Sequence, residues 1–245
     1  MKKQIFTIIA FVIPLVSYCQ IKNPKLKNLT DSASYALGFS VSSNLAQNNL
    51  DSLNLDAFII GYKEAQNSDL HKISESELDN IIKNYAEVKL KEKFAVNIVN
   101  GDKFLAENKK KKGVITTPSG LQYEIITVGK GKKVELNDSI TVHYNGTKLD
   151  GTIFDSSLGT DPTTFQLVEG GLIEGWIEAL QLMNEGSKYK FYIPQNLGYG
   201  MSGNQTIEPF ETIIFEIDLI KVVKQSEFKY SIDEIPMDEN NVDGE

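Results

Sequence analysis

Apolar residues recur at every second position in several short stretches of the second half of the chain. The clearest stretches are 139–144, 188–193 and 213–219. Such alternation predicts strands with one buried face and one wetter face, and the Asp-Gly pair at 150–151 predicts a tight turn between two strands. Between 173 and 183 the apolar residues share one helical face instead. The simplest assembly that buries these apolar faces is an antiparallel sheet packed on one short helix.

The first half of the chain follows helical spacing. Shorter helices are expected between Asp31 and about Asn67. A longer helix is expected to begin at Ser74, which lies three residues before Glu77 as in a capping box. Apolar residues then recur at steps of three and four, and no proline interrupts 74–112. The predicted fold class is therefore α+β, with an all-α domain that ends in one long helix before the sheet.

The length of that helix predicts a partner. A helix over 74–112 would be roughly 55–60 Å long at 1.5 Å per residue. Its apolar stripe is too long for one small domain to cover, so it should pack on the preceding helices along its whole length or on a second copy of the chain. Exposed apolar stripes of this extent usually mark an interface. We expect a homodimer formed mainly through residues 31–90.

The first residues predict export. Residues 1–19 combine a basic start, a short apolar run and small residues at the end, which is typical of a secretory signal peptide. Cys19, the only cysteine, has two interpretations: it carries a lipid, or it flanks a cleavage site before Gln20. The bulky Tyr18 favours cleavage and a periplasmic or otherwise exported protein. A membrane partner is expected only if Cys19 is lipidated, as in an anchored lipoprotein.

The charge distribution excludes one class of partner. The 245-residue chain has a net charge of −8, and all 25 of its basic residues are lysines. Removal of residues 1–19 would leave −10, and residues 225–245 alone carry −6. A nucleic-acid-binding protein needs a clustered basic face. Lys109–Lys112 is the only long basic run, and it is typical of a solvated helix end, so we expect no nucleic-acid partner.

Composition also divides the chain after the signal peptide. One or two domains are usual for this length. We expect a flexible lead-in over 20–30, a helical dimerisation domain over 31–112, a turn-rich linker over 113–120 and a sheet domain over 121–224. The tail over 225–245 is acidic and lacks apolar periodicity, which predicts disorder.

Five stretches of the second half supply aromatic or branched apolar side chains and very few titratable groups. That composition indicates a dry, aromatic-walled pocket with a few polar groups, as in many small-ligand sites. It does not indicate a nucleophile or a metal. His71 and His143 are far apart and have no third ligand, so neither a metal nor a cofactor is expected. The stretches are V-H-Y-N-G (142–146), D-G-T-I-F-D-S-S (150–157), G-L-I-E-G-W (171–176), I-P-Q-N-L-G-Y-G (193–200) and I-E-P-F-E-T-I-I-F-E-I-D-L (207–219).

The order and spacing of these stretches resemble the FKBP-type peptidyl-prolyl cis-trans isomerases, from about Ser119 to Lys224. Short helices followed by one long helix resemble the dimeric macrophage-infectivity-potentiator group of that family. The resemblance implies an FKBP-like sheet wrapped on a short helix. It also implies a non-covalent, cofactor-free isomerase that acts on unfolded or folding proline-containing polypeptides.

The resemblance also assigns roles to residues of the pocket. Trp176 would form its floor, against which the proline ring rests. The Ile173 N–H and the Tyr199 hydroxyl would each hold a substrate carbonyl, and Asp155 would be the one carboxylate inside the ring of aromatics. The catalytic set implied is Tyr144, Phe154, Asp155, Ile173, Trp176, Tyr199 and Phe215, and the substrate-binding set is Phe165, Leu172 and Ile207.

The sequence departs from the family pattern at three places. Thr163 stands where a further aromatic residue is common, and Glu208 replaces the first of two prolines, although Pro209 remains. No arginine lies in the 156–162 loop to pair with Asp155. These departures leave open a second function: a holdase chaperone or binding scaffold with a non-catalytic FKBP fold.

Overall fold

The structure is a computed structural model that describes residues 25–50, 52–66 and 72–227. The chain falls into two compact units that divide at Asp51. The predicted signal peptide, Cys19, His71 and nearly all of the predicted acidic tail lie outside the described residues. The predicted domain boundaries stay a prediction.

Helices make up the first half of the described chain, as the apolar spacing predicts. Asparagine side chains cap the first two helices: Asn28 accepts from the Asp31 N–H at 2.8 Å, and Asn54 accepts from the Ala57 N–H at 3.1 Å. At the third helix the Ser74 N–H donates to the Glu77 carboxylate at 3.3 Å. The helices are α1 (Leu29–Gln47), α2 (Leu55–Glu64), α3 (Glu75–Lys93) and α4 (Ala95–Asn108).

The single long helix predicted over 74–112 is wrong, because α3 and α4 are separate helices. Phe94 between them has φ −107° and ψ 24°, outside the helical range. Neither glycine nor proline causes this break. We attribute the break to the packing of α4 on the sheet domain, because tertiary packing can override local helical preference. Residues 109–112 follow α4 rather than extend it.

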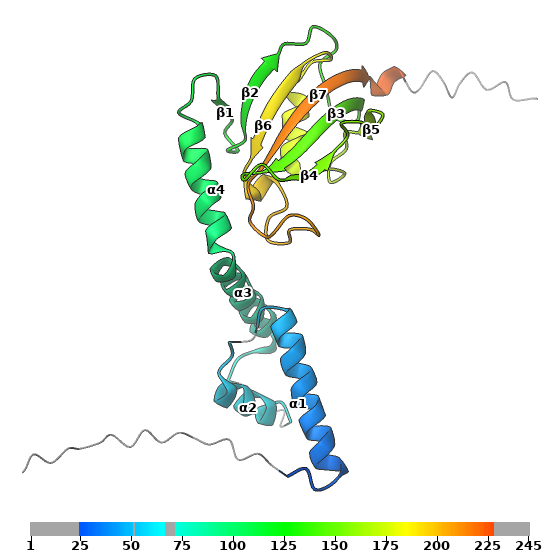
Figure 1. Cartoon of the computed structure of the whole chain (residues 1–245). Coiled ribbons are helices and arrows are strands. Elements are labelled where there is room, and N and C mark those ends of the chain that lie inside the picture. The colour runs from blue at the N-terminus through cyan, green and yellow to red at the C-terminus, as the bar shows by residue number, and fades with distance from the viewer. Residues whose placement is uncertain (1–24, 51, 67–71, 228–245) are drawn as a thin grey trace, which may run out of the picture. The chain divides into compact units, whose positions relative to one another are not determined.

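A seven-stranded antiparallel sheet forms the second half (Figure 1). Its order is β1-β2-β6-β7-β3-β4, and β5 pairs with β3. The α+β fold class and the antiparallel sheet are confirmed. The strands are β1 (Ile115–Thr116), β2 (Gln122–Thr127), β3 (Ser139–Lys148), β4 (Ile153–Ser156), β5 (Thr163–Gln166), β6 (Lys188–Ile193) and β7 (Ile213–Val223).

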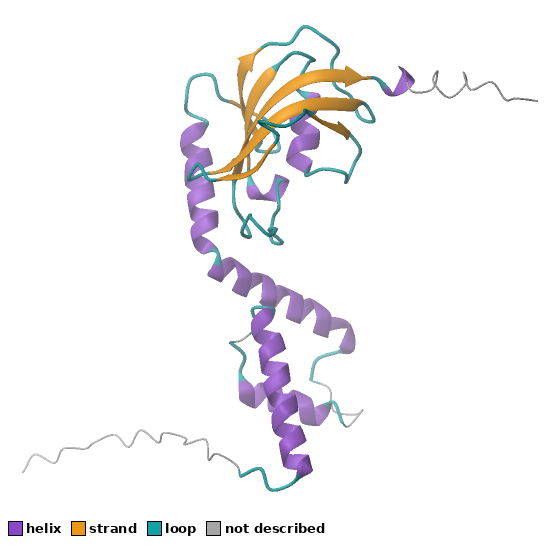
Figure 2. Cartoon of the chain, turned by 45° about the vertical axis from the view of Figure 1, so that its right-hand side comes forward, coloured by secondary structure: helices purple, strands orange, loops and turns teal. Residues whose placement is uncertain are grey.

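One short helix, α5 (Glu174–Gln181), covers one face of this sheet (Figure 2). Trp176, Ala179 and Leu180 of α5 are buried in the same core as Phe191 and Ile217 of the sheet. The core thus joins the period-2 pattern of the strands to the helical pattern after residue 173. A single turn of 3₁₀ helix, η1 (Gln195–Leu197), follows β6.

Helix α4 packs on the opposite face of the same sheet. Tyr192 lies between Phe191 and Ile193 on β6, and both of those side chains belong to the core. Because successive side chains of a strand point to opposite faces, the Tyr192 side chain points away from the core. There its ring lies 5.6 Å from that of Phe104 on α4. Next to it, the Asn108 amide donates to Gln122 Oε1 at 3.0 Å, and Gln122 Nε2 donates to the Leu105 carbonyl at 2.9 Å.

This amide pair should fix α4 to the sheet. Asn108 is fully buried and Gln122 is 3% exposed. The change Asn108→Ala would leave the buried Gln122 oxygen without a donor, so we expect the free energy of unfolding to fall by about 1–3 kcal/mol. Chemical denaturation would measure it. Asn100→Ala, at an exposed position of the same helix, is the control and should change stability by less than about 0.5 kcal/mol. Equal effects of the two variants would contradict this account.

Candidate active site

Strand β3 brings the aromatic residues of the second half together. It pairs with β4, β5 and β7, so rings from four strands converge around it. Gly146 on β3 makes this convergence possible. A Cβ at that position would lie 2.7 Å from the rings of both Phe154 and Phe215. Any larger residue would therefore displace two rings of the cluster.

Trp176 is the centre of the ring cluster. Its indole makes three edge-to-face contacts, with centroid separations of 5.0 Å to Phe215, 5.3 Å to Tyr144 and 5.6 Å to Phe165. Edge-to-face rings at these distances attract one another beyond the effect of burial alone. The indole is 4% exposed, and its Nε1 has no hydrogen-bond partner among the described residues. Helix α5 therefore presents a rigid aromatic surface.

A cavity of about 320 Å³ lies over this surface. Its size falls within the usual range of small-ligand pockets. Eight of the ten site residues that the resemblance implies line it, and the sequence did not indicate the ninth, Gly171, because a glycine carries no side chain to mark a site. The lining residues are Tyr144, Asp155, Phe165, Gly171, Leu172, Ile173, Trp176, Tyr199 and Phe215.

Two of the expected site residues do not line the cavity. The Phe154 ring packs edge-to-face on Phe215 at 5.3 Å, so it supports a residue that does line the cavity. Ile207 is 1% exposed and lies within the hydrophobic core.

The polar groups of the cavity are two phenols and one carboxylate. The Tyr144 hydroxyl donates to Asp155 Oδ2 at 3.0 Å. Burial, and then this bond to Asp155, raise the pKa of Tyr144 to about 12. Burial, assisted by the negative charge of Asp155, also raises the pKa of Tyr199. Both phenols therefore remain protonated donors at neutral pH.

The start of α5 adds a backbone donor. Ile173 is the N-cap residue, with an extended backbone at φ −60° and ψ 146°, and its carbonyl accepts from the Trp176 N–H at 2.9 Å. Its own N–H makes no hydrogen bond within the described residues. Because Ile173 lines the cavity, a carbonyl placed there would meet an unpaired N–H beside a helix N-terminus, where partial positive charge gathers.

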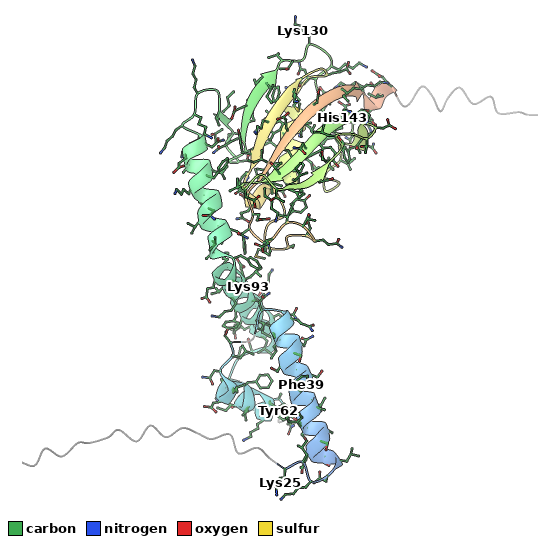
Figure 3. The ribbon with its side chains drawn as sticks, viewed as in Figure 1. Lys25, Phe39, Tyr62, Lys93, Lys130 and His143 are labelled. Carbon is green, nitrogen blue, oxygen red and sulfur yellow. The ribbon has the colours of Figure 1, made fainter. Side chains whose placement is uncertain are left out.

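The remaining chemistry-bearing groups near the cavity have structural partners. His143 is labelled on β3 in Figure 3, and its Nδ1 lies 3.1 Å from the buried Ser157 hydroxyl. That hydroxyl accepts from the Tyr144 N–H at 2.9 Å, so the pair braces the β3 backbone. Within residues 25–50, 52–66 and 72–227 no three His, Cys, Asp or Glu side chains gather as metal ligands. The arrangement can bind an apolar ring and hydrogen-bond carbonyls.

One departure from the family pattern has a structural partner. The Asn97 amide of α4 donates to Glu208 Oε2 at 3.0 Å and to the Pro209 carbonyl at 3.1 Å. Glu208 thus links α4 to the loop that follows Tyr199. The sequence contained no signal for this contact, since the two residues are 111 positions apart.

Comparison with known proteins covers both halves of the chain. The family "FKBP-type peptidyl-prolyl cis-trans isomerase" matches residues 130–220. A second family, "Domain amino terminal to FKBP-type peptidyl-prolyl isomerase", matches residues 30–125. The crystal structure of FkpA from Escherichia coli is 32% identical in sequence and superposes with a TM-score of 0.53. That superposition covers 81% of this chain and 99% of that one.

Curated relatives match over similar lengths. The FKBP-type 22 kDa peptidyl-prolyl cis-trans isomerase of Escherichia coli is 35% identical over 82% of this chain and 98% of its own. Outer membrane protein MIP of Legionella longbeachae is 36% identical over 79% of this chain and 86% of its own. With the aromatic cluster in place, these matches show that the chain belongs to the FKBP-type peptidyl-prolyl cis-trans isomerases that carry the amino-terminal domain.

Proposed function

We propose that this isomerase accelerates rotation about X–Pro bonds in unfolded or folding exported polypeptides, without a covalent intermediate. The observation that carries the proposal is the Trp176 surface at the base of an aromatic-lined cavity. A proline ring is compact and apolar, and it would rest on that surface. The cavity lining includes no serine, cysteine, lysine or histidine, which agrees with a non-covalent reaction.

The reaction itself needs no nucleophile. Amide resonance opposes rotation with a barrier of about 18–20 kcal/mol, and uncatalysed X–Pro exchange takes tens to hundreds of seconds. The planar amide is more polar than the twisted transition state, so a poorly hydrated cavity destabilises the planar form relative to the twisted one. Walls that fit the twisted imide better than the flat one act in the same direction. Each 1.36 kcal/mol of such preference gives tenfold in rate.

The polar groups would orient the substrate. In this proposal the Ile173 N–H holds one substrate carbonyl and the Tyr199 hydroxyl holds a second. Asp155 fixes the orientation of the Tyr144 hydroxyl through their 3.0 Å hydrogen bond. With the carbonyls on either side of the proline held, rotation is confined to the imide bond. Orientation lowers the barrier because the bound substrate is already held in a productive geometry.

The helical region supports a homodimer. No residue of α1 is buried, and Tyr35, Leu37 and Phe39 are 60%, 67% and 67% exposed. Figure 3 labels Phe39 on α1. The second unit also exposes apolar residues on α3, such as Ile82 at 54%. Apolar surface on this scale is rare on a soluble monomer, and a second copy of the chain is the partner we propose to cover it.

Export is also part of the proposal. The basic and apolar pattern of residues 1–19 supports it, and one relative is named an outer membrane protein. Along the described part of the chain, every helix is too short or too polar to cross a membrane. The clients would then be proteins that fold after secretion.

The pocket assignment predicts how cavity variants lose activity. Trp176→Ala and Phe215→Ala should each lower kcat/KM on a short X–Pro peptide by about tenfold or more, equivalent to about 1.4 kcal/mol, and Asp155→Ala should have a milder effect. Phe191→Leu is the control, because Phe191 is fully buried but does not line the cavity. A proline-isomer exchange assay would measure the rates, with circular dichroism to confirm folding. Wild-type protein that binds peptides without accelerating exchange would favour the holdase.

The raised pKa of Tyr144 predicts a pH dependence. Its usual value near 10 applies to the unfolded chain, whereas the folded value is about 12. Between those values the folded state keeps a proton that the unfolded state loses, so stability falls as pH rises. Tyr144→Phe should therefore lose less stability than wild type between pH 10 and 12 in denaturant titrations. Superimposable curves for the two proteins would show that the phenol is well hydrated.

The dimer proposal predicts that charge on α1 releases monomers. Tyr35→Asp with Phe39→Asp places two carboxylates in the exposed apolar surface, and burying them would cost several kcal/mol. We expect light scattering to give a dimer mass for wild type and a monomer mass for this variant, with unchanged activity on short peptides. Ser40→Asp with Gln47→Asp adds the same charge to another face of this helix and should stay dimeric. Monomeric wild-type protein at micromolar concentration would refute the proposal.

A further inference from the structure

Asp155 brings an uncompensated negative charge to the cavity. One of its oxygens accepts from the neutral Tyr144 hydroxyl, and none of the ion pairs among the described residues includes it. No lysine lines the cavity, and the chain contains no arginine. The loop after Asp155 adds no cation and contains a further acid, Asp161.

A second hollow extends this negative region. It has a volume of about 370 Å³ and is lined by Glu169, Glu174 and Glu178 together with Gly170, Ile177 and Gln181. The same segment, 169–178, lines both hollows, since Gly171–Ile173 and Trp176 lie in the aromatic cavity. Glu178 is held by the Ser119 hydroxyl at 2.6 Å, a neutral partner. No basic side chain lines the second hollow either.

Some acids elsewhere in the sheet domain pair with lysines. Glu211 pairs with Lys148 at 3.0 Å, Glu216 with Lys188 at 2.7 Å and Asp138 with Lys224 at 2.9 Å. Among the described residues, none of the acids that line the two hollows has such a lysine partner. The charge of Asp155 acts inside the cavity, because it contributes, after burial, to the raised pKa of Tyr199.

We propose that Asp155, Glu169 and Glu174 select X–Pro segments that carry lysine or arginine close to the proline and disfavour segments with acidic neighbours. This inference rests on the proposed function and adds the substrate class. The aromatic surface accepts any proline, so selection comes from the residues on either side of it. A cation there would remain partly hydrated and would not need a buried ion pair.

The expected preference is modest and depends on salt. Two unit charges about 7 Å apart at a protein surface, with an effective dielectric constant of about 40–80, change the binding constant by about three- to sevenfold. Ions at high concentration screen charges at that separation. The preference should therefore be largest at low salt and nearly disappear at high salt.

Three peptides that differ only in the residues flanking one proline, as Lys, Gln or Glu, would test this with the full chain. The kcat/KM values at about 20 mM and about 500 mM salt bracket the screening range. We expect the order Lys, Gln, Glu at low salt, with a Lys-to-Glu ratio of about fivefold or more. The ratio should shrink in Asp155→Asn, which keeps an acceptor for Tyr144, and in the double variant Glu169→Gln, Glu174→Gln. The double variant should leave the Gln peptide unaffected.

Glu107→Gln is the control for net charge, since Glu107 is exposed on α4 and lines neither hollow. Equal rates for the three peptides would overturn the inference, as would a preference that survives both sets of variants. If no peptide is turned over, the proposed function fails, and binding then decides the inference. Trp176 is the only tryptophan, so its fluorescence reports affinity for the same peptides, and equal affinities would refute charge selection.

Discussion

The packing of the Trp176 indole against three rings is the interaction on which the site depends. Those contacts, at 5.0–5.6 Å, hold α5 against the sheet. Ile173 is the N-cap of the same helix, so the position of its free N–H follows from where the indole is anchored. One packing interaction therefore sets both the apolar surface and the backbone donor. Because interiors tolerate little change in volume, Gly146 matters as much as the rings do, since it leaves the space that two of them occupy.

A second constraint acts on the segment that carries Tyr199. The loop after it folds back on itself: the Gly203 N–H donates to the Tyr199 carbonyl at 3.2 Å, and the Phe210 N–H donates to the Gly200 carbonyl at 2.8 Å. Phe210 has φ +63°, a left-handed conformation that costs about 1–3 kcal/mol for such a residue. Its burial, at 2% exposure, offsets that cost. The Asn97 amide of α4 donates hydrogen bonds to Glu208 and to the Pro209 carbonyl of this loop. Helix α4 therefore helps to position the cavity, although it belongs to the helical first half of the chain.

The sequence predicts most of the sheet and most of the cavity, for a local reason. Alternation in 188–193 and 213–219 depends only on which face of a strand is buried, and every lining ring except Phe165 stands within one of the five short stretches. The break at Phe94 could not be predicted, because neither a glycine nor a proline marks it in the sequence. Ile207 was expected to line the cavity, but it is 1% exposed and is not among the lining residues, since a sequence pattern shows that a side chain is buried without showing which space it faces. The roles assigned to the lining residues stay predictions.

The position of Asp155 explains how an apolar cavity can carry a charge. The carboxylate is exposed at the rim, so it keeps most of its hydration and avoids the large penalty of a buried, unpaired ion. Tyr144 spans the two environments, with its ring against Trp176 and its hydroxyl on the carboxylate. The apolar base can therefore act on the imide bond while the rim acts on the flanking residues. Because these are different atoms in different dielectric surroundings, a change of charge at the rim can alter which segments are chosen without altering how the bond rotates.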